Sequence, residues 1–173
     1  MDRIKACCCT GHRPQKFPFK YGGDSENYLS YLRELEKRIE YAIESCGINR
    51  FVSGMALGVD ADFAEVVLKY RERYPIELEC AVPCRDQARL WGKRDKLRYE
   101  EILRRADKVT FVSEEYSSDC MLKRNRYMVD KSELVIAVFN GTKSGGTWYT
   151  INYARRSGKQ VEIIDLNKGE SLL

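Results

Sequence analysis

Long apolar runs are missing from this sequence of 173 residues. No stretch approaches the roughly 18 apolar residues that cross a bilayer as a helix, and the N-terminal MDRIKACCC lacks the length and the small-residue cleavage site of a signal peptide. A cytoplasmic protein without a membrane partner is therefore predicted. With 43% hydrophobic and 32% charged residues, the chain is expected to form one globular domain over residues 1–173.

Metal ligands are also scarce in the sequence. His12 is the only histidine, and Cys80 and Cys84 are four residues apart, which is not the C-x-x-C spacing of zinc sites. The cysteine count of seven is odd, and without an export signal paired disulfides are not expected. The cysteines are predicted to be small buried hydrophobic side chains, with no metal and no required cofactor.

The common nucleotide-binding motifs are absent as well. The sequence contains neither the G-x-G-x-x-G fingerprint of dinucleotide-binding folds nor the Walker A lysine loop. The formal net charge is only +4, which suits an anionic small molecule as well as a nucleic acid. Charge and standard motifs therefore leave the ligand class open.

What the sequence does have is a strict alternation of short β-rich runs with longer helical patterns. Strands are expected over 4–9, 50–54, 76–82, 108–112, 133–139 and 160–166. Helices are expected over 25–46, 61–74, 86–106 with a break near Gly92, 120–131 and 146–156. This alternation predicts a three-layer α/β sandwich with a mostly parallel six-stranded sheet. With the common order 3-2-1-4-5-6, the loops after the first and fourth strands would flank the ligand crevice.

Three glycine-bearing segments follow strands of the expected sheet: TGHRP, SGMALGVD and NGTKSGGT. Each by itself is explained by a chain reversal, but three at one sheet edge favour a phosphate site in front of helix N-termini. In the helix over 120–131, an asparagine next to an arginine adds groups for a base edge, a ribose or a phosphate. The candidate ligand-binding residues are Thr10, Gly11, His12, Arg13, Ser53, Gly54, Met55, Gly58, Asp60, Arg124, Asn125, Asn140, Gly141, Gly145, Gly146 and Thr147.

His12 has three interpretations. It can contact a phosphate or ribose, it can act as a general acid or base with a pKa near neutrality, or it can pack against its own loop. Arg13 is the stronger phosphate partner because its guanidinium can bind two oxygens at once.

The string TGHRPQKF, followed by FVSGMALGVDADFAE, PCRDQARLW, RNRYMVD and SGGTWYTINYARRSGK, closely resembles the YpsA-like branch of the SLOG superfamily over residues 6–164. This superfamily includes the Smf/DprA DNA-processing proteins and the LOG phosphoribohydrolases. The resemblance implies a Rossmann-like fold that binds a nucleotide or a nucleotide-derived ligand, and a homodimer or higher oligomer. It places Gly145, Gly146 and Thr147 at the positions that embrace a phosphate.

One departure bears on catalysis. The phosphoribohydrolases carry a catalytic glutamate three residues after the threonine of this loop, and that position here is Thr150. A neutral side chain offers little to a cationic, oxocarbenium-like sugar. Catalytic residues stay unassigned: the candidates are His12, Asp60 and Glu65, with Asp60 alternatively a helix N-cap and Glu65 a solvated helix residue.

The leading hypothesis is a binder or sensor of a nucleotide-like ligand of the adenine nucleotide, ADP-ribose or NAD type. The alternatives are a nucleoside or nucleotide N-glycosidase and a single-stranded nucleic-acid-binding protein. The basic segment 85–105 supports nucleic acid, and the mild net charge argues against it.

Overall fold

The computed structural model describes residues 3–168 of the chain. Within this range six strands form one sheet, in which all neighbouring strands run parallel. The strands are β1 (Ala6–Thr10), β2 (Arg50–Ser53), β3 (Glu77–Val82), β4 (Lys108–Phe111), β5 (Leu134–Phe139) and β6 (Gln160–Asp165). Their order in the sheet is β4-β3-β2-β1-β5-β6.

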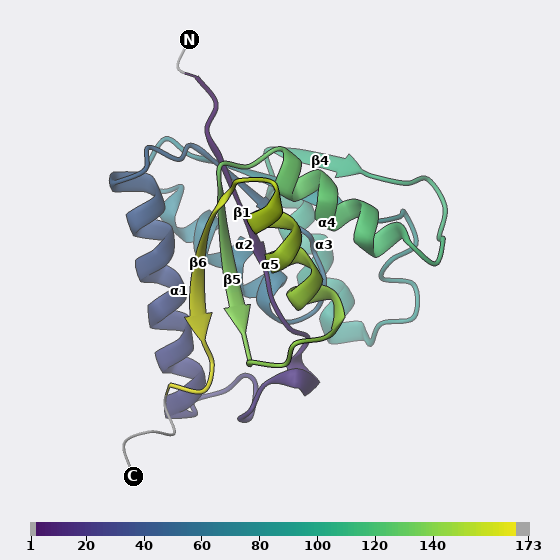
Figure 1. Ribbon diagram of the computed structural model, residues 1–173. Coiled ribbons are helices and arrows are strands. Elements are labelled where there is room, and N and C mark those ends of the chain that lie inside the picture. The colour runs from purple at the N-terminus through teal and green to yellow at the C-terminus, as the bar shows by residue number, and fades with distance from the viewer. Residues whose placement is uncertain (1–2, 169–173) are drawn as a thin grey trace.

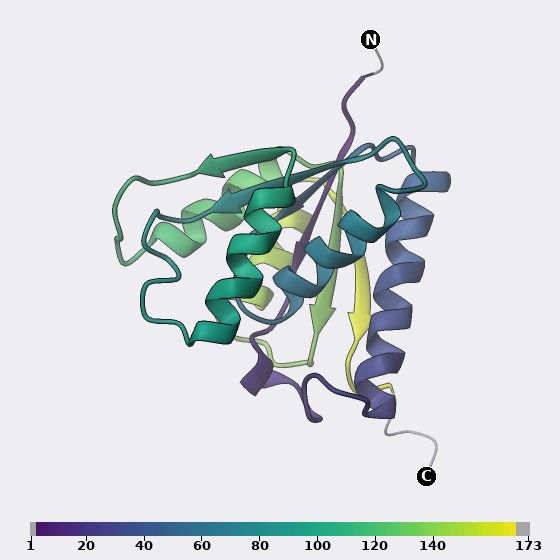
Figure 2. The same ribbon diagram turned by 180° about the vertical axis from the view of Figure 1, so that it is seen from behind.

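Helices cover both faces of the sheet. They are α1 (Glu26–Glu44), α2 (Val59–Tyr70), α3 (Lys93–Arg105), α4 (Cys120–Asp130) and α5 (Gly145–Arg156), with a 3-10 turn, η1 (Pro14–Lys16), after β1. Figure 1 shows α4 and α5 on one face, and Figure 2 shows α1, α2 and α3 on the other. The expected Rossmann-like, three-layer α/β sandwich is therefore confirmed.

The strand order differs from 3-2-1-4-5-6 in the place of β4. This strand lies outside β3 at the sheet edge, and β5 takes the position beside β1, so chain direction across the sheet reverses between β1 and β5. The physical reason lies in the strand sequences. LVIAVF of β5 is an unbroken apolar run that suits a central strand buried on both faces, whereas KVTF of β4 exposes Lys108 and Val109.

Local sequence signals account for most helix boundaries. The hydroxyl of Ser25 accepts a hydrogen bond from the N–H of Tyr28 and caps α1, whose buried side chains recur every three or four residues. The helix expected over 61–74 starts earlier, at Val59, and ends at Tyr70. None of the helices within residues 3–168 combines the length and the apolar composition needed to cross a membrane.

The cysteines are part of the hydrophobic core. All seven are free thiols and six of them are buried. Burial is the main cause that raises the pKa of Cys8 to about 12, and it also raises the pKa of Cys9. These thiols are neutral near pH 7 and are poor nucleophiles.

Candidate functional site

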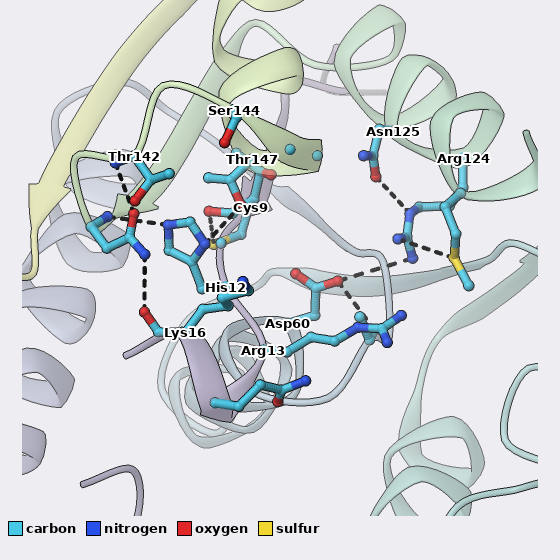
Figure 3. Close-up of a pocket in the computed structure, with 18 of the residues that line it drawn as sticks. Cys9, His12, Arg13, Lys16, Asp60, Arg124, Asn125, Thr142, Ser144 and Thr147 are labelled. Carbon is cyan, nitrogen blue, oxygen red and sulfur yellow. Dashed lines mark hydrogen bonds and ion pairs between the residues drawn. The ribbon is translucent and has the colours of Figure 1, made fainter. Parts of the chain in front are cut away.

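A cavity of about 490 Å³ opens at the carboxyl ends of β1 and β5 (Figure 3). This is the point at which the strand order reverses, where ligands bind in open parallel sheets. The crevice therefore lies between the loops after β1 and β5, and not between the loops after β1 and β4. Its volume is within the range of about 300–1,000 Å³ that is typical of small-molecule sites.

Most of the predicted ligand-binding residues line this cavity, although they come from four separate segments. They are Thr10, Gly11, His12 and Arg13 after β1, Asp60 on α2, Arg124 and Asn125 on α4, and Asn140, Gly145, Gly146 and Thr147 after β5. The lining holds three cations (Arg13, Lys16 and Arg124) and one carboxylate (Asp60). The excess of positive charge favours an anionic ligand.

The other predicted residues after β2 lie behind the cavity wall. The hydroxyl of Ser53 donates to the carbonyl oxygen of Asp60 at 2.8 Å and accepts from the N–H of Met55 at 3.2 Å. The carbonyl oxygen of Gly54 accepts from Nη1 of Arg124. These groups shape the turn between β2 and α2, and they do not line the cavity.

Gly58 and Gly141 also lie outside the cavity lining. Gly58 precedes α2 with a φ of 90°, and a Cβ there would lie 2.6 Å from the carbonyl oxygen of His12. Only glycine fits this close crossing of the two loops. Gly141 has a φ of 88° and is an exposed position of the loop after β5.

His12 connects the loops after β1 and β5. Its Nε2 accepts a hydrogen bond from the N–H of Asn140 at 3.1 Å, and its Nδ1 lies 3.5 Å from Oγ1 of Thr147. An Nε2 that accepts carries no proton, so the proton of the neutral ring is on Nδ1. Burial, followed by the charge of Lys16, lowers the pKa of His12, which agrees with a neutral ring. The loop-packing role is thus present, and Nδ1 faces the hydroxyl of Thr147, which also lines the cavity.

The side chain of Asn140 is committed to the same loops. Its Nδ2 donates to the carbonyl oxygen of Lys16 at 3.0 Å, and its Oδ1 accepts from the N–H of Thr142 at 2.9 Å. The sequence marks Asn140 as a ligand contact, but its amide atoms hold the cavity walls together. The mouth of the cavity is therefore preorganised by protein hydrogen bonds.

Arg124 and Asp60 form the deep wall. Arg124 is buried, donates from Nε to Oδ1 of Asn125 at 2.8 Å, and has its Nη1 4.0 Å from Oδ2 of Asp60. The same Oδ2 accepts the N–H of Ala56 at 3.1 Å. The alternative role of Asp60 as a helix N-cap is wrong, because the N-cap of α2 is Gly58 and Asp60 is the second residue of the helix. Burial is the largest cause that raises the pKa of Asp60, and Arg124 opposes it. Because Asn125 uses its oxygen to hold Arg124, its Nδ2 is the group left for a ligand.

The first turn of α5 forms the opposite wall. Its N-cap, Ser144, makes no side-chain cap hydrogen bond, and Gly145 has a φ of 81°. A Cβ on Gly146 would be 4.0 Å from Nδ2 of Asn125, so the backbone of the turn faces an amide donor across a narrow gap. Backbone N–H groups of a first helical turn lack partners inside the helix and bind anions well.

Two further positions lie away from the cavity lining: Thr150, which stands where the phosphoribohydrolases carry a glutamate, and the catalytic candidate Glu65. Thr150 is 1% exposed, and its hydroxyl donates to the carbonyl oxygen of Gly146 at 2.8 Å. Glu65 pairs with Arg98 at 2.6 Å on the outer side of α2. Asp60 is consequently the only carboxylate among the residues that line the cavity within the described part of the chain.

Several lining residues were not predicted from the sequence. Lys16 lies in η1, three residues after Arg13. As a second cation in a turn that contains glycine and proline, it could have been predicted to line the anion site. Met121 and Met128 lie one turn before and after the predicted pair on α4, so helical spacing also pointed to them. The remaining ones are Cys9, Gln15, Ala56, Thr142 and Ser144.

Comparison with known proteins agrees with the motifs. Residues 7–168 match the model of the YspA SLOG family, YpsA. The uncharacterized SPbeta prophage-derived protein YoqJ of Bacillus subtilis (strain 168) is 35% identical over 121 residues, which cover 62% of this chain and 70% of that protein.

UPF0398 proteins are similar over more of the chain. That of Bacillus pumilus is 32% identical over 155 residues, which cover 87% of this chain and 82% of the relative. That of Halalkalibacterium halodurans is 28% identical over 163 residues, which cover 91% of this chain and 84% of the relative. The family model and the relatives confirm the resemblance drawn from the motifs, and the chain belongs to the YspA SLOG family.

Proposed function

We propose that this protein binds a nucleotide-type ligand, of the adenine nucleotide, ADP-ribose or NAD type, in the cavity between the loops after β1 and β5, and acts as a binder or sensor of it. One observation carries the proposal: the open first turn of α5 and the guanidinium groups of Arg13 and Arg124 line a single cavity. A phosphate there accepts hydrogen bonds from the backbone N–H groups of α5 on one wall, and the arginines on the opposite wall neutralise its charge.

The distribution of charge favours a small ligand over a nucleic acid. In the basic segment 85–105, three of the eight cations are paired with carboxylates: Arg85 with Glu114, Arg98 with Asp62, and Arg104 with Glu101. Paired arginines attract a phosphate backbone less than free ones, because each is already neutralised. The cavity, by contrast, has more cations than carboxylates.

The glycosidase alternative has a weak chemical basis. Position 150 is a buried threonine whose hydroxyl is bonded to the helix backbone, so no carboxylate comes from α5. Asp60 is the carboxylate left to stabilise a cationic sugar, and Arg124 and Arg13 already act on its charge. Binding without turnover is therefore the function that these residues favour.

The proposal is tested by titrating AMP, ADP-ribose and NAD into the full chain by calorimetry and native mass spectrometry. Arg13→Ala and Gly146→Val are expected to lower affinity at least about tenfold, because a charge-assisted hydrogen bond is lost or a side chain fills the phosphate position. Gly146 has no positive φ and its Cβ meets open space up to Asn125, so the variant is expected to fold.

Matched controls are available at the start of α3. Arg94→Ala removes an exposed arginine and Gly92→Val fills an open glycine position, and both lie outside the cavity lining. Unchanged binding in Arg13→Ala and Gly146→Val, with correct folding by circular dichroism, would refute the placement of the site. Masses of the nucleotides after incubation separate sensor from glycosidase, and an oligonucleotide titrated at two salt concentrations tests nucleic acid, whose binding weakens steeply with salt.

A further inference from the structure

The carboxylate of Asp60 has one oxygen that the protein does not use. Oδ2 accepts the N–H of Ala56 and faces Arg124, whereas no donor within residues 3–168 lies at hydrogen-bonding distance from Oδ1. The side chain is only 8% exposed, and the residue lines the cavity. Figure 3 shows Asp60 between His12 and Arg124 with its second oxygen turned away from the arginine. A nearly buried carboxylate thus presents a free acceptor to the ligand space.

The chemistry of this oxygen selects its partner. A carboxylate repels a phosphate, so the phosphate is held at the α5 wall and the group that meets Asp60 is a neutral hydrogen-bond donor. In a nucleotide the moiety joined directly to the phosphate is the sugar, which carries hydroxyl donors. Acidic side chains bind ribose hydroxyls in this way in dinucleotide-binding folds.

We infer that Asp60 binds a sugar hydroxyl of the ligand and selects ribose phosphates over 2-deoxyribose phosphates. The inference rests on the proposed function, because it assumes a phosphate at the first turn of α5. Two hydrogen bonds fix the position of Asp60. The N–H of Ala56 donates to its Oδ2, and the hydroxyl of Ser53 donates to the backbone carbonyl oxygen of Asp60 at 2.8 Å. A fixed acceptor discriminates well between ligands that do and do not carry the donor.

The test uses probes that lack a base, so that base preference has no influence. Ribose 5-phosphate, 2-deoxyribose 5-phosphate and inorganic phosphate are titrated into the full wild-type chain, and the imidazole resonances of His12, the only histidine, report binding by NMR. Wild type is expected to bind ribose 5-phosphate about ten- to a hundredfold more tightly than the deoxy compound, the worth of a hydrogen bond to a charged group.

Asp60→Asn should change the two measured affinities in different ways. Removing the negative charge is expected to strengthen binding of inorganic phosphate while the preference for ribose disappears, whereas a damaged fold would weaken both. AMP and 2′-deoxy-AMP, titrated in the same way, extend the comparison to whole nucleotides.

Each outcome is decisive. Equal binding of the ribose and deoxyribose phosphates to wild type, or a preference that persists in Asp60→Asn, overturns the assignment while the phosphate site stands. If Asp60→Asn does not fold, the wild-type comparison alone decides. If wild type binds none of inorganic phosphate, the sugar phosphates and AMP, the proposed function has failed and the inference fails with it.

Discussion

Asp62 offers a quantitative test of how α1, α2 and α3 are held together. Its side chain is 1% exposed and accepts hydrogen bonds from the hydroxyls of Tyr21, Tyr28 and Tyr31 at 2.8, 3.0 and 3.1 Å. Arg98 on α3 donates to it at 2.7 Å. One buried carboxylate on α2 therefore collects four donors, which come from α1, from α3 and from the segment that follows η1.

The expected cost of Asp62→Ala follows from which donors keep another partner. Arg98 keeps Glu65, and the hydroxyl of Tyr21 keeps the carbonyl oxygen of Gly58 at 3.3 Å. The hydroxyls of Tyr28 and Tyr31 lose the acceptor to which they donate. At about 1–3 kcal/mol for each of these two unsatisfied buried donors, the free energy of unfolding should fall by about 2–6 kcal/mol.

Glu65→Ala is the matched control because Glu65 is on the same helix and pairs with the same arginine, but its side chain is 49% exposed. Its cost should stay within about 1 kcal/mol, as for a surface ion pair. Urea unfolding, followed by circular dichroism and by the fluorescence of Trp91 and Trp148, measures both values. A loss for Asp62→Ala as small as that for Glu65→Ala would refute the reasoning.

Two further predictions concern the loops around the cavity. Because the pKa of His12 is lowered in the native state, the unfolded chain binds more protons than the native chain once the pH falls below the ordinary pKa of 6.5. Wild type should therefore lose stability as pH falls between about 7 and 5. His12→Gln should not show this loss. An NMR titration of the single imidazole that gives an ordinary or raised pKa would contradict this. Gly58→Ala should destabilise more than Gly22→Ala, since the two glycines have φ values of 90° and 85° but only Gly58 would place a Cβ against the carbonyl oxygen of His12. Equal unfolding midpoints in urea for the two variants would show that the loop contact contributes nothing.

The sequence predicted the elements well where periodicity was strong. The helix expected over 120–131 is observed over Cys120–Asp130, and the strand expected over 133–139 is observed over Leu134–Phe139. The position of β4 was not predicted, because alternation of strands and helices does not determine at which strand the order reverses. The contrast between the apolar run of β5 and the polar β4 contained that information.

Side-chain roles within the site were harder to predict than its location. Glycine turns at strand ends indicated where the cavity would lie, since parallel strands bring their carboxyl ends to one edge. Asn140 was predicted to contact the ligand, and only the fold places the carbonyl oxygen of Lys16 3.0 Å from its Nδ2. The sequence does not reveal which distant residue a polar side chain contacts in the fold: Asn140 and Lys16 are 124 residues apart.

The same contacts explain why four separate segments make one site. Nε2 of His12 joins the loop after β1 to Asn140, and Arg124 joins α4 to the carbonyl oxygen of Gly54. Each contact uses a polar group that would otherwise compete for the ligand. Within residues 3–168 the lining groups that remain for a ligand are Nδ2 of Asn125, Oδ1 of Asp60, the first turn of α5 and the cationic ends of Arg13 and Lys16. All of these are donors except Oδ1 of Asp60. That asymmetry fits a ligand with an anionic end and a neutral hydroxyl-bearing part better than it fits an inorganic anion alone, because a bare anion would leave the acceptor of Asp60 without a partner.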